Sequence, residues 1–336
     1  MEEKGRIGIP KALMYYRYFP FWSVFFEELG WKVKVSDGLG RTGKIIYFED
    51  SCLPMKLLVT HAVSLRNQVD FLFVPRLVSL HRTFIMCPKF RGAPDILRLA
   101  GEGHLPMIDE TIDLRIGRNA LLQSFLRIGE KLGASNAESK RAFAKGEQVY
   151  FKFKKEWNDR INRLPLKSLF QLDIPTPSQE KKSTLRVAFI GHPYNLFDAD
   201  INKDVLTLTN QLGIEILTPD HLSEKEIDRE ISDLSKEIYW SSGREIVGAL
   251  FHFLKGGVDG VIFLTSFKCG IDALLQEFIK RSLKIRKESA TPFLVLSFDE
   301  HTGREGLVTR LEAFKDVVEQ RKAMSNAKLK VQINDK

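Results

Sequence analysis

Two stretches of the chain repeat one order of elements: an apolar strand-like run, an amphipathic helical pattern, a glycine and a second strand-like run. The first stretch covers residues 6–35 with Gly30 after the helix, and the second covers residues 185–217 with Gly213 in that place. Glycine after a helix favours the left-handed conformation that ends it. Because strands joined through a helix pair in parallel, the pattern predicts two α/β lobes. No sequence identity relates the two stretches.

The length of the chain agrees with two lobes, since 336 residues exceed one ordinary hydrophobic core. We expect an N-terminal α/β lobe over residues 1–113 and a C-terminal α/β lobe over residues 185–322. A helical segment and linker over residues 114–184 are expected to connect them. The polar residues 323–336 are expected to form a frayed tail.

Within this plan, hydrophobic periodicity predicts the individual elements. An aromatic helix over residues 15–29 is expected to pack in the core through Phe19, Trp22, Phe25, Phe26 and Leu29. Further strand-like runs lie at 45–48, 69–75, 260–264 and 292–298. Further helices are expected at 54–67, 94–100, 114–132, 137–164, 201–212, 224–254 (interrupted near residues 241–243), 271–286 and 307–320. A loop is expected over residues 76–83.

Composition narrows the possible partners. The formal charge of +8 is spread along the chain apart from a basic run at 280–287, and no nucleic-acid reading motif is present. A phosphate-bearing small molecule or an acidic protein partner explains this charge without nucleic acid. The acidic N-terminus lacks the pattern of a secretory signal, and no window approaches the roughly 18 apolar residues of a membrane span. We therefore expect a cytoplasmic protein without membrane contact.

The three cysteines are the strongest candidates for chemistry. Cys52, Cys87 and Cys269 each have a glycine or proline within two residues and lie where a strand pattern gives way to a helix pattern. Their wide spacing excludes a zinc finger or a ferredoxin-type run, and a reducing compartment disfavours disulfides. Inert core thiols, a nucleophile and metal ligands remain open. The loop positions favour three thiolates that converge on one iron–sulfur cluster, because free backbone amides can hydrogen-bond its sulfurs.

Four motifs, at residues 9–16, 49–56, 87–90 and 299–314, resemble the 2-hydroxyacyl-CoA dehydratase superfamily. The resemblance spans about residues 5–320 and is closest to the activase-associated (CoA enzyme activase-related) branch, which includes double-cubane cluster proteins. It implies an α/β fold of two flavodoxin-like lobes, doubly wound around mainly parallel sheets, with an intervening helical segment.

The resemblance also implies a cofactor and its ligands. Cys52, Cys87 and Cys269 match the three cysteines that hold a [4Fe–4S] cluster, either alone with an open fourth position or as part of a double-cubane [8Fe–9S] cluster. A separate ATP-dependent activator ATPase would supply low-potential electrons. The chain itself has no P-loop signature, and no CoA-binding motif is recognisable in it.

The implied function is an iron–sulfur dehydratase or reductase that acts on an acyl-CoA or other small-molecule substrate. Homodimers and heterodimers with a related subunit both fit the family. One alternative is a non-catalytic electron-transfer or regulatory iron–sulfur subunit of an activator complex. Another is a binding protein with three reduced thiols and no metal.

Three further residues are candidates for catalysis. His301 follows the last strand and His192 follows the strand that opens the second lobe, and both are placed for proton transfer. Ser51 precedes the first cysteine and, like Asp50, is also a candidate cap of the next helix. Lys56 and Lys268 lie beside cysteines and can offset negative charge. His61 and His252 are expected to be structural.

Overall fold

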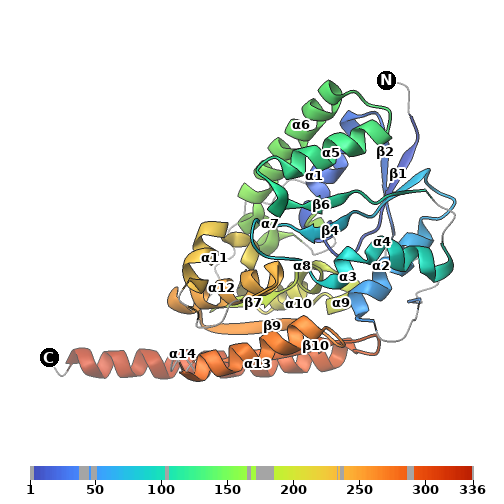
Figure 1. Ribbon diagram of the computed structural model, residues 1–336. Coiled ribbons are helices and arrows are strands. Elements are labelled where there is room, and N and C mark those ends of the chain that lie inside the picture. Colours follow the sequence, from blue (N-terminus) through green and yellow to red (C-terminus); the bar gives the residue numbers. More distant parts are fainter. Residues whose placement is uncertain are drawn as a thin grey trace. The chain divides into compact units, whose positions relative to one another are not determined.

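The computed structural model describes residues 4–37, 45–46, 51–102, 106–164, 168–171, 185–232, 234, 238–285 and 291–334. Contacts divide the chain into two compact units. The first unit comprises Met1–Trp157, Phe170–Ile174 and Ser235–Arg244, and the second comprises Asn158–Leu169, Pro175–Leu234 and Glu245–Lys336. Each unit contains a four-stranded parallel sheet with helices packed against it (Figure 1). The expected α/β class with parallel sheets is confirmed.

The sheet of the first unit has the order β2-β1-β3-β5. Its strands are β1 (Arg6–Ile9), β2 (Lys32–Val35), β3 (Phe71–Phe73) and β5 (Met107–Ile108). The chain starts in the middle, adds β2 on one side and then builds outward on the other side. This is the flavodoxin-like order, and its switch point lies between β1 and β3.

A second, two-stranded parallel sheet joins β4 (Arg76–Ser79) to β6 (Thr111–Asp113). The expectation of a loop over residues 76–83 is therefore wrong for its first half, where hydrogen bonding to β6 outweighs the weak local pattern. The strand-like run at 45–48 is not a strand at Ile45 and Ile46, and its other two residues lie outside the described part of the chain.

The helices of the first unit pack through aromatic side chains. Phe25 and Phe26 of α1 are fully buried, as the sequence predicted, and Phe21 meets Phe125 and Phe143 edge-to-face with ring centroids 4.7 and 5.2 Å apart. The helical elements are α1 (Tyr15–Glu28), α2 (Leu53–Ser64), α3 (Pro88–Arg91), α4 (Ala93–Leu97), η1 (Arg98–Glu102), η2 (Leu114–Ile116), α5 (Ala120–Lys131) and α6 (Asn136–Lys155).

Contacts place α5 and α6 with the first sheet, because both pack with α1 through these rings. The next helix, α7 (Trp157–Arg163), lies almost wholly in the second unit. The domain boundaries expected at residues 113 and 184 remain predictions.

The sheet of the second unit has the order β10-β9-β7-β8. Its strands are β7 (Leu185–Gly191), β8 (Ile214–Leu217), β9 (Gly260–Ser266) and β10 (Phe293–Phe298), all paired in parallel. Counted along the chain, this is the same order as in the first unit, with the switch point between β7 and β9. Every residue of β9 is buried, as expected for a parallel strand covered on both faces.

The helical elements of the second unit include α8 (Pro193–Phe197), α9 (Ala199–Asn202), α10 (Val205–Gln211), η4 (Pro219–His221), α11 (Glu224–Ile231), α13 (Gly270–Ile285) and α14 (Arg304–Asn334). The helix expected over residues 201–212 is broken, because Lys203 and Asp204 adopt left-handed φ angles of 54° and 65°. The helical stretch expected over residues 224–254 with an interruption near residues 241–243 consists of two helices, α11 and α12 (Ser241–Lys255), and the interruption lies before Ser241. Helix α14 extends through Asn334, into the residues 323–336 for which the sequence pattern predicts a frayed tail.

Within the described residues, no helix combines the length and the apolar character that a membrane crossing requires.

Candidate functional site

Cys52 begins helix α2 in the first unit. It is the N-cap residue, with extended backbone angles of φ −71° and ψ 152°, and Met55 N–H donates to its carbonyl at 3.0 Å. Among the described residues no side chain caps this helix, so Ser51 is not its cap, and Asp50, the other expected cap, lies outside the described residues. The buried Cys52 therefore stands at the positive end of the helix dipole, which favours a thiolate.

Cys87 begins helix α3 in the same unit. Burial raises the pKa of its thiol, while hydrogen bonds from the backbone N–H groups of Lys89 and Phe90 oppose that rise. Negative charge on Cys52 also raises the pKa of Cys87, so the two thiols lie within electrostatic range of each other. Two of the three predicted ligand cysteines are thus brought together in one unit.

The segment before Cys87 is held on two sides. Met86 N–H donates to Val78 O of β4 at 2.9 Å, and Ser241 N–H donates to Ile85 O at 2.9 Å. Because these are backbone contacts, they fix the direction in which the chain enters α3.

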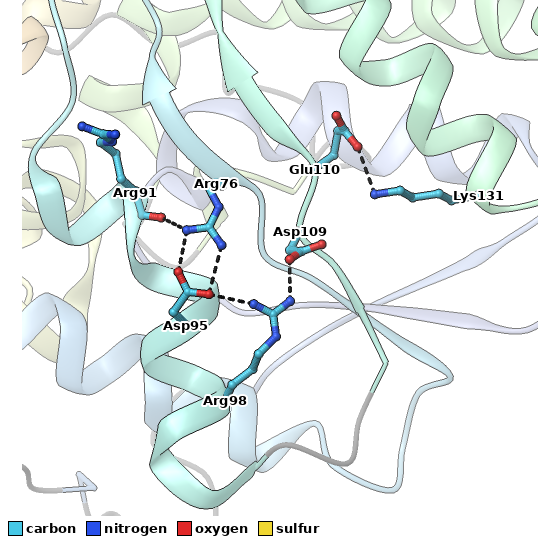
Figure 2. Close-up of polar contacts among 7 residues, drawn as sticks. All are labelled: Arg76, Arg91, Asp95, Arg98, Asp109, Glu110 and Lys131. Carbon is cyan, nitrogen blue, oxygen red and sulfur yellow. Dashed lines mark hydrogen bonds and ion pairs between the residues drawn. The ribbon is translucent and has the colours of Figure 1, made fainter.

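An ion-pair network holds the segment after Cys87 (Figure 2). Arg76 of β4 donates to the two carboxylate oxygens of Asp95 at 2.6 and 3.0 Å, and to the carbonyl of Arg91. Arg98 joins Asp95 to Asp109 at 2.9 and 2.5 Å. The hydrogen bond from Arg76 is the main cause that lowers the pKa of Asp95. The network ties β4 to the two short helices that follow Cys87.

A neighbouring carboxylate connects the end of β5 to α5. Burial of Glu110 raises its pKa, but hydrogen bonds from Arg127 and Lys131 hold the pKa below its usual value. Figure 2 shows the contact with Lys131 beside the network of Arg76.

In the second unit, His192 and Cys269 lie just after the ends of the two central strands. His192 comes after β7, and Cys269 comes three residues after the end of β9, where its N–H donates to Ser266 O at 3.0 Å. Lys268 has a left-handed φ of 65°, which turns the chain into α13. Both residues therefore lie at the switch point of this sheet, where ligands of α/β folds bind.

Asp272 completes a group with these two residues. One ligand atom from each of His192, Cys269 and Asp272 lies within 4.8 Å of the others. His192 Nε2 is 2.8 Å from Asp272 Oδ1, and each of these two side chains is only 2–3% exposed. Sequence reasoning missed Asp272. Its spacing of three residues from Cys269 was the available signal, because residues three apart share a helix face.

Buried polar groups fix the orientation of Asp272. Its Oδ2 accepts hydrogen bonds from Ser266 N–H at 3.1 Å and from Asn195 Nδ2 at 3.2 Å. Asn195 is itself held by Ser266 Oγ, which donates to its Oδ1 at 2.6 Å, and by Leu264 O, which accepts from its Nδ2 at 3.2 Å. These contacts leave Oδ1 turned toward His192.

The short contact between His192 and Asp272 lacks the alignment of a hydrogen bond. Within the described residues, neither His192 Nε2 nor Asp272 Oδ1 has a hydrogen-bond partner, although both atoms are buried. Buried polar atoms in native proteins nearly always have partners, so this pair calls for a physical reason.

The other candidate residues are not members of this group. Ser51 is buried directly before Cys52, and His301 is exposed in the turn after β10, where its N–H donates to Asp299 Oδ1 at 3.0 Å. His61 is completely buried, with Ser36 Oγ 2.8 Å from its Nδ1. Burial and the charge of Lys11 lower the pKa of His61 to about 4, as expected for a neutral structural histidine.

The fold and these sites define a two-unit α/β protein with cysteines at the starts of helices. Residues 6–222 match the CoA enzyme activase uncharacterised domain. Since the match covers more than half of the chain, the chain belongs to that family, which fits the activase-associated branch expected from the motifs. No curated protein matches the chain. The matched part contains Cys52, Cys87 and His192 and ends before Cys269.

Proposed function

We propose that this protein is an iron–sulfur protein of the 2-hydroxyacyl-CoA dehydratase type. It would receive low-potential electrons from a separate ATP-dependent activator ATPase and pass them to a substrate for dehydration or reduction. The observation that carries the proposal is the shared position of Cys52, Cys87 and Cys269, each directly before the first turn of a helix. Membership of a family linked to CoA enzyme activation supports it.

The surroundings of the cysteines suit such a cofactor. Amide groups in the first turn of a helix lack partners within the helix, so they are available to cluster sulfurs. The backbone N–H groups of Lys89 and Phe90 partly offset the rise that burial causes in the pKa of the Cys87 thiol. Lys56 is buried one turn into α2 and can offset the negative charge of thiolates.

Cys52, Cys87 and Cys269 would hold the [4Fe–4S] cluster, alone or as part of a double-cubane [8Fe–9S] cluster. When bound, the cluster supplies one-electron transfer at low potential and an open iron position for the substrate. The protein's own residues would position the substrate and move protons. His192, next to Cys269 and buried, and His301, exposed after β10, are the candidate proton donors, and Ser51 is a candidate hydrogen-bond donor.

The proposed partners follow from this role. They are the activator ATPase, a second copy of the chain or a related subunit, and an acyl-CoA or another small-molecule substrate.

One observation favours a second candidate, a non-catalytic electron-transfer or regulatory subunit. The cavity at the switch point of the first unit has a volume of only about 30 Å³ and an apolar lining that includes Ile9, Leu13 and Phe73. Pockets for small molecules typically hold about 300–1,000 Å³. This cavity does not admit an acyl-CoA, so the first unit would carry electrons without binding substrate there.

Anaerobic reconstitution tests the cofactor. The full chain is loaded with iron and sulfide, and both elements are counted in the wild type and in the Cys52→Ser, Cys87→Ser and Cys269→Ser variants. We expect each variant to lose most of its cluster, while His301→Ala retains it. Full iron and sulfide content in any one cysteine variant would refute a three-cysteine site.

A second experiment separates the two functions. The loaded protein is mixed with the activator and ATP, and cluster reduction is followed by electron paramagnetic resonance. A screen of 2-hydroxyacyl-CoA substrates then follows. Turnover supports the enzyme, whereas reduction without turnover supports the electron-transfer subunit.

A further inference from the structure

The second unit brings together three side chains with different donor atoms: an imidazole nitrogen, a thiol sulfur and a carboxylate oxygen. We propose that His192 Nε2, Cys269 Sγ and Asp272 Oδ1 form a site for a single divalent transition-metal ion. All three donors come from the switch-point edge of one sheet. The site is independent of Cys52 and Cys87.

The first argument is the state of the two buried atoms. His192 Nε2 and Asp272 Oδ1 are 2.8 Å apart without hydrogen-bond geometry, and neither has another partner among the described residues. A cation between them satisfies the nitrogen lone pair and the carboxylate charge together, because metal-bound histidine is neutral and the carboxylate is ionised. A neutral imidazole lone pair that faces a carboxylate in a buried site is costly, and a bound cation removes that cost.

The second argument is that supporting contacts hold the donors in place. The two hydrogen bonds to Asp272 Oδ2, from Ser266 N–H and Asn195 Nδ2, leave Oδ1 as the oxygen that faces His192. The His192 ring stacks on Tyr194 with centroids 4.9 Å apart and planes 15° apart. Outer contacts of this kind orient ligands in metal sites and typically change metal affinity by about 10- to 100-fold.

The third argument is the backbone. Gly191, directly before His192, passes so close to β9 that a Cβ atom there would lie 2.7 Å from Leu264 O. The close approach of the two strands brings the start of α8 toward the start of α13, which carries Cys269 and Asp272. Rigid strands and helix starts, rather than long loops, therefore position all three donors.

The donor set selects the class of metal. Thiolate and imidazole favour Zn²⁺, Co²⁺ or Fe²⁺ over Mg²⁺ and Ca²⁺, which prefer oxygen ligands. Three protein ligands leave one position of a tetrahedral ion open, as in catalytic zinc sites. Binding releases the thiol proton of Cys269 to solvent and involves no redox change. Because Cys269 is also a ligand of the proposed cluster, the single ion and the cluster are alternative occupants.

Cobalt is a suitable probe because thiolate coordination gives it a charge-transfer absorption band. The metal-free full-length chain, kept anaerobic with a thiol-free reductant, is titrated with Co²⁺ and then with Zn²⁺. We expect one equivalent of Co²⁺ with a thiolate band, and loss of the band when Zn²⁺ displaces it. His192→Ala, Asp272→Asn and Cys269→Ser should weaken binding by about tenfold or more.

Two variants serve as matched controls. Cys87→Ser removes a cysteine at another helix start, and His252→Gln changes a histidine of the same unit outside the group. Both should bind Co²⁺ like the wild type. Circular dichroism checks folding, and if Asp272→Asn does not fold, His192→Gln, which keeps most of the ring's volume, replaces it.

Several results would overturn the proposal. They are a folded wild type without a thiolate band, a band that survives in Cys269→Ser, and a band that disappears in Cys87→Ser. The last result would assign the metal to the three-cysteine site. Failure of cluster assembly leaves cobalt binding unchanged, so the two proposals fail separately.

Discussion

His192 Nε2 and Asp272 Oδ1 lie 2.8 Å apart, although His192 directly follows β7 and Asp272 lies in the first turn of α13, far along the chain. The contact exists because β7 and β9 are adjacent in the sheet and both chains turn into helices at its carboxyl edge. Asp272 also accepts two hydrogen bonds through its other carboxylate oxygen, which makes it the centre of the buried polar group.

Replacing Asp272 should therefore destabilise the second unit. Asp272→Ala leaves Ser266 N–H and the Asn195 amide without their acceptor, at a cost of about 1–3 kcal/mol for each buried group. Urea unfolding of the metal-free protein measures the loss. Asp316→Ala, which removes an exposed carboxylate of α14, is the control and should change stability by less than about 0.5 kcal/mol. Equal stability of the two variants would show that these two hydrogen bonds to Asp272 do not stabilise the fold.

Gly191→Ala should also destabilise the protein. The new Cβ would lie 2.7 Å from Leu264 O, a backbone atom that can move only if β9 moves. Overpacking of this kind costs about 1–3 kcal/mol. The matched control is Gly306→Ala in α14, where no atom lies within 4 Å of the added Cβ and alanine favours the helix. Thermal unfolding should show a lower melting temperature for the first variant alone.

His61 should make stability depend on pH. The pKa of His61 is lowered to about 4 in the fold, mainly by burial, from 6.5 in the unfolded chain. Below pH 6.5 the unfolded chain therefore binds a proton that the folded protein does not. The contribution is complete above the unfolded pKa and is lost as pH falls toward 4, by about 2 kcal/mol between about pH 7 and pH 5.

Urea unfolding at several pH values measures this effect. His61→Gln should show a flatter dependence than the wild type, while His301→Gln, which changes an exposed histidine, should follow the wild type. If the free energy of unfolding of His61→Gln depends on pH as steeply as that of the wild type, the effect comes from other groups.

Arg76→Met should weaken the attachment of the helices that follow Cys87. It removes the paired hydrogen bonds to Asp95 and the bond to Arg91 O. Because Asp95 is half exposed and water screens the pair, we expect only a small loss of stability, which shrinks as salt is added. Arg118→Met, at an exposed arginine, is the control. If both variants lose the same stability at every salt concentration, the ion pair with Asp95 is not the cause of the loss.

Local patterns in the sequence were sufficient for much of the fold. The runs at residues 6–9 and 260–266 are strands, and the aromatic face with Phe25 and Phe26 is core, because apolar periodicity and burial follow from the same side chains. The pattern wrongly predicted a loop at Arg76–Ser79, which is a strand because it pairs with β6, more than 30 residues later in the chain. It also failed at Lys203 and Asp204, whose left-handed backbone interrupts a helix that the apolar spacing continued.

The sequence by itself determined the parallel α/β class and the position of each cysteine at the start of a helix, since both depend on contacts between near neighbours. Only the tertiary structure decided that Asp272 joins His192 and Cys269, and that Cys87 lies within electrostatic range of Cys52. The physical reason is that strand order in a sheet is set by long-range pairing, and strand order selects which helix starts share an edge.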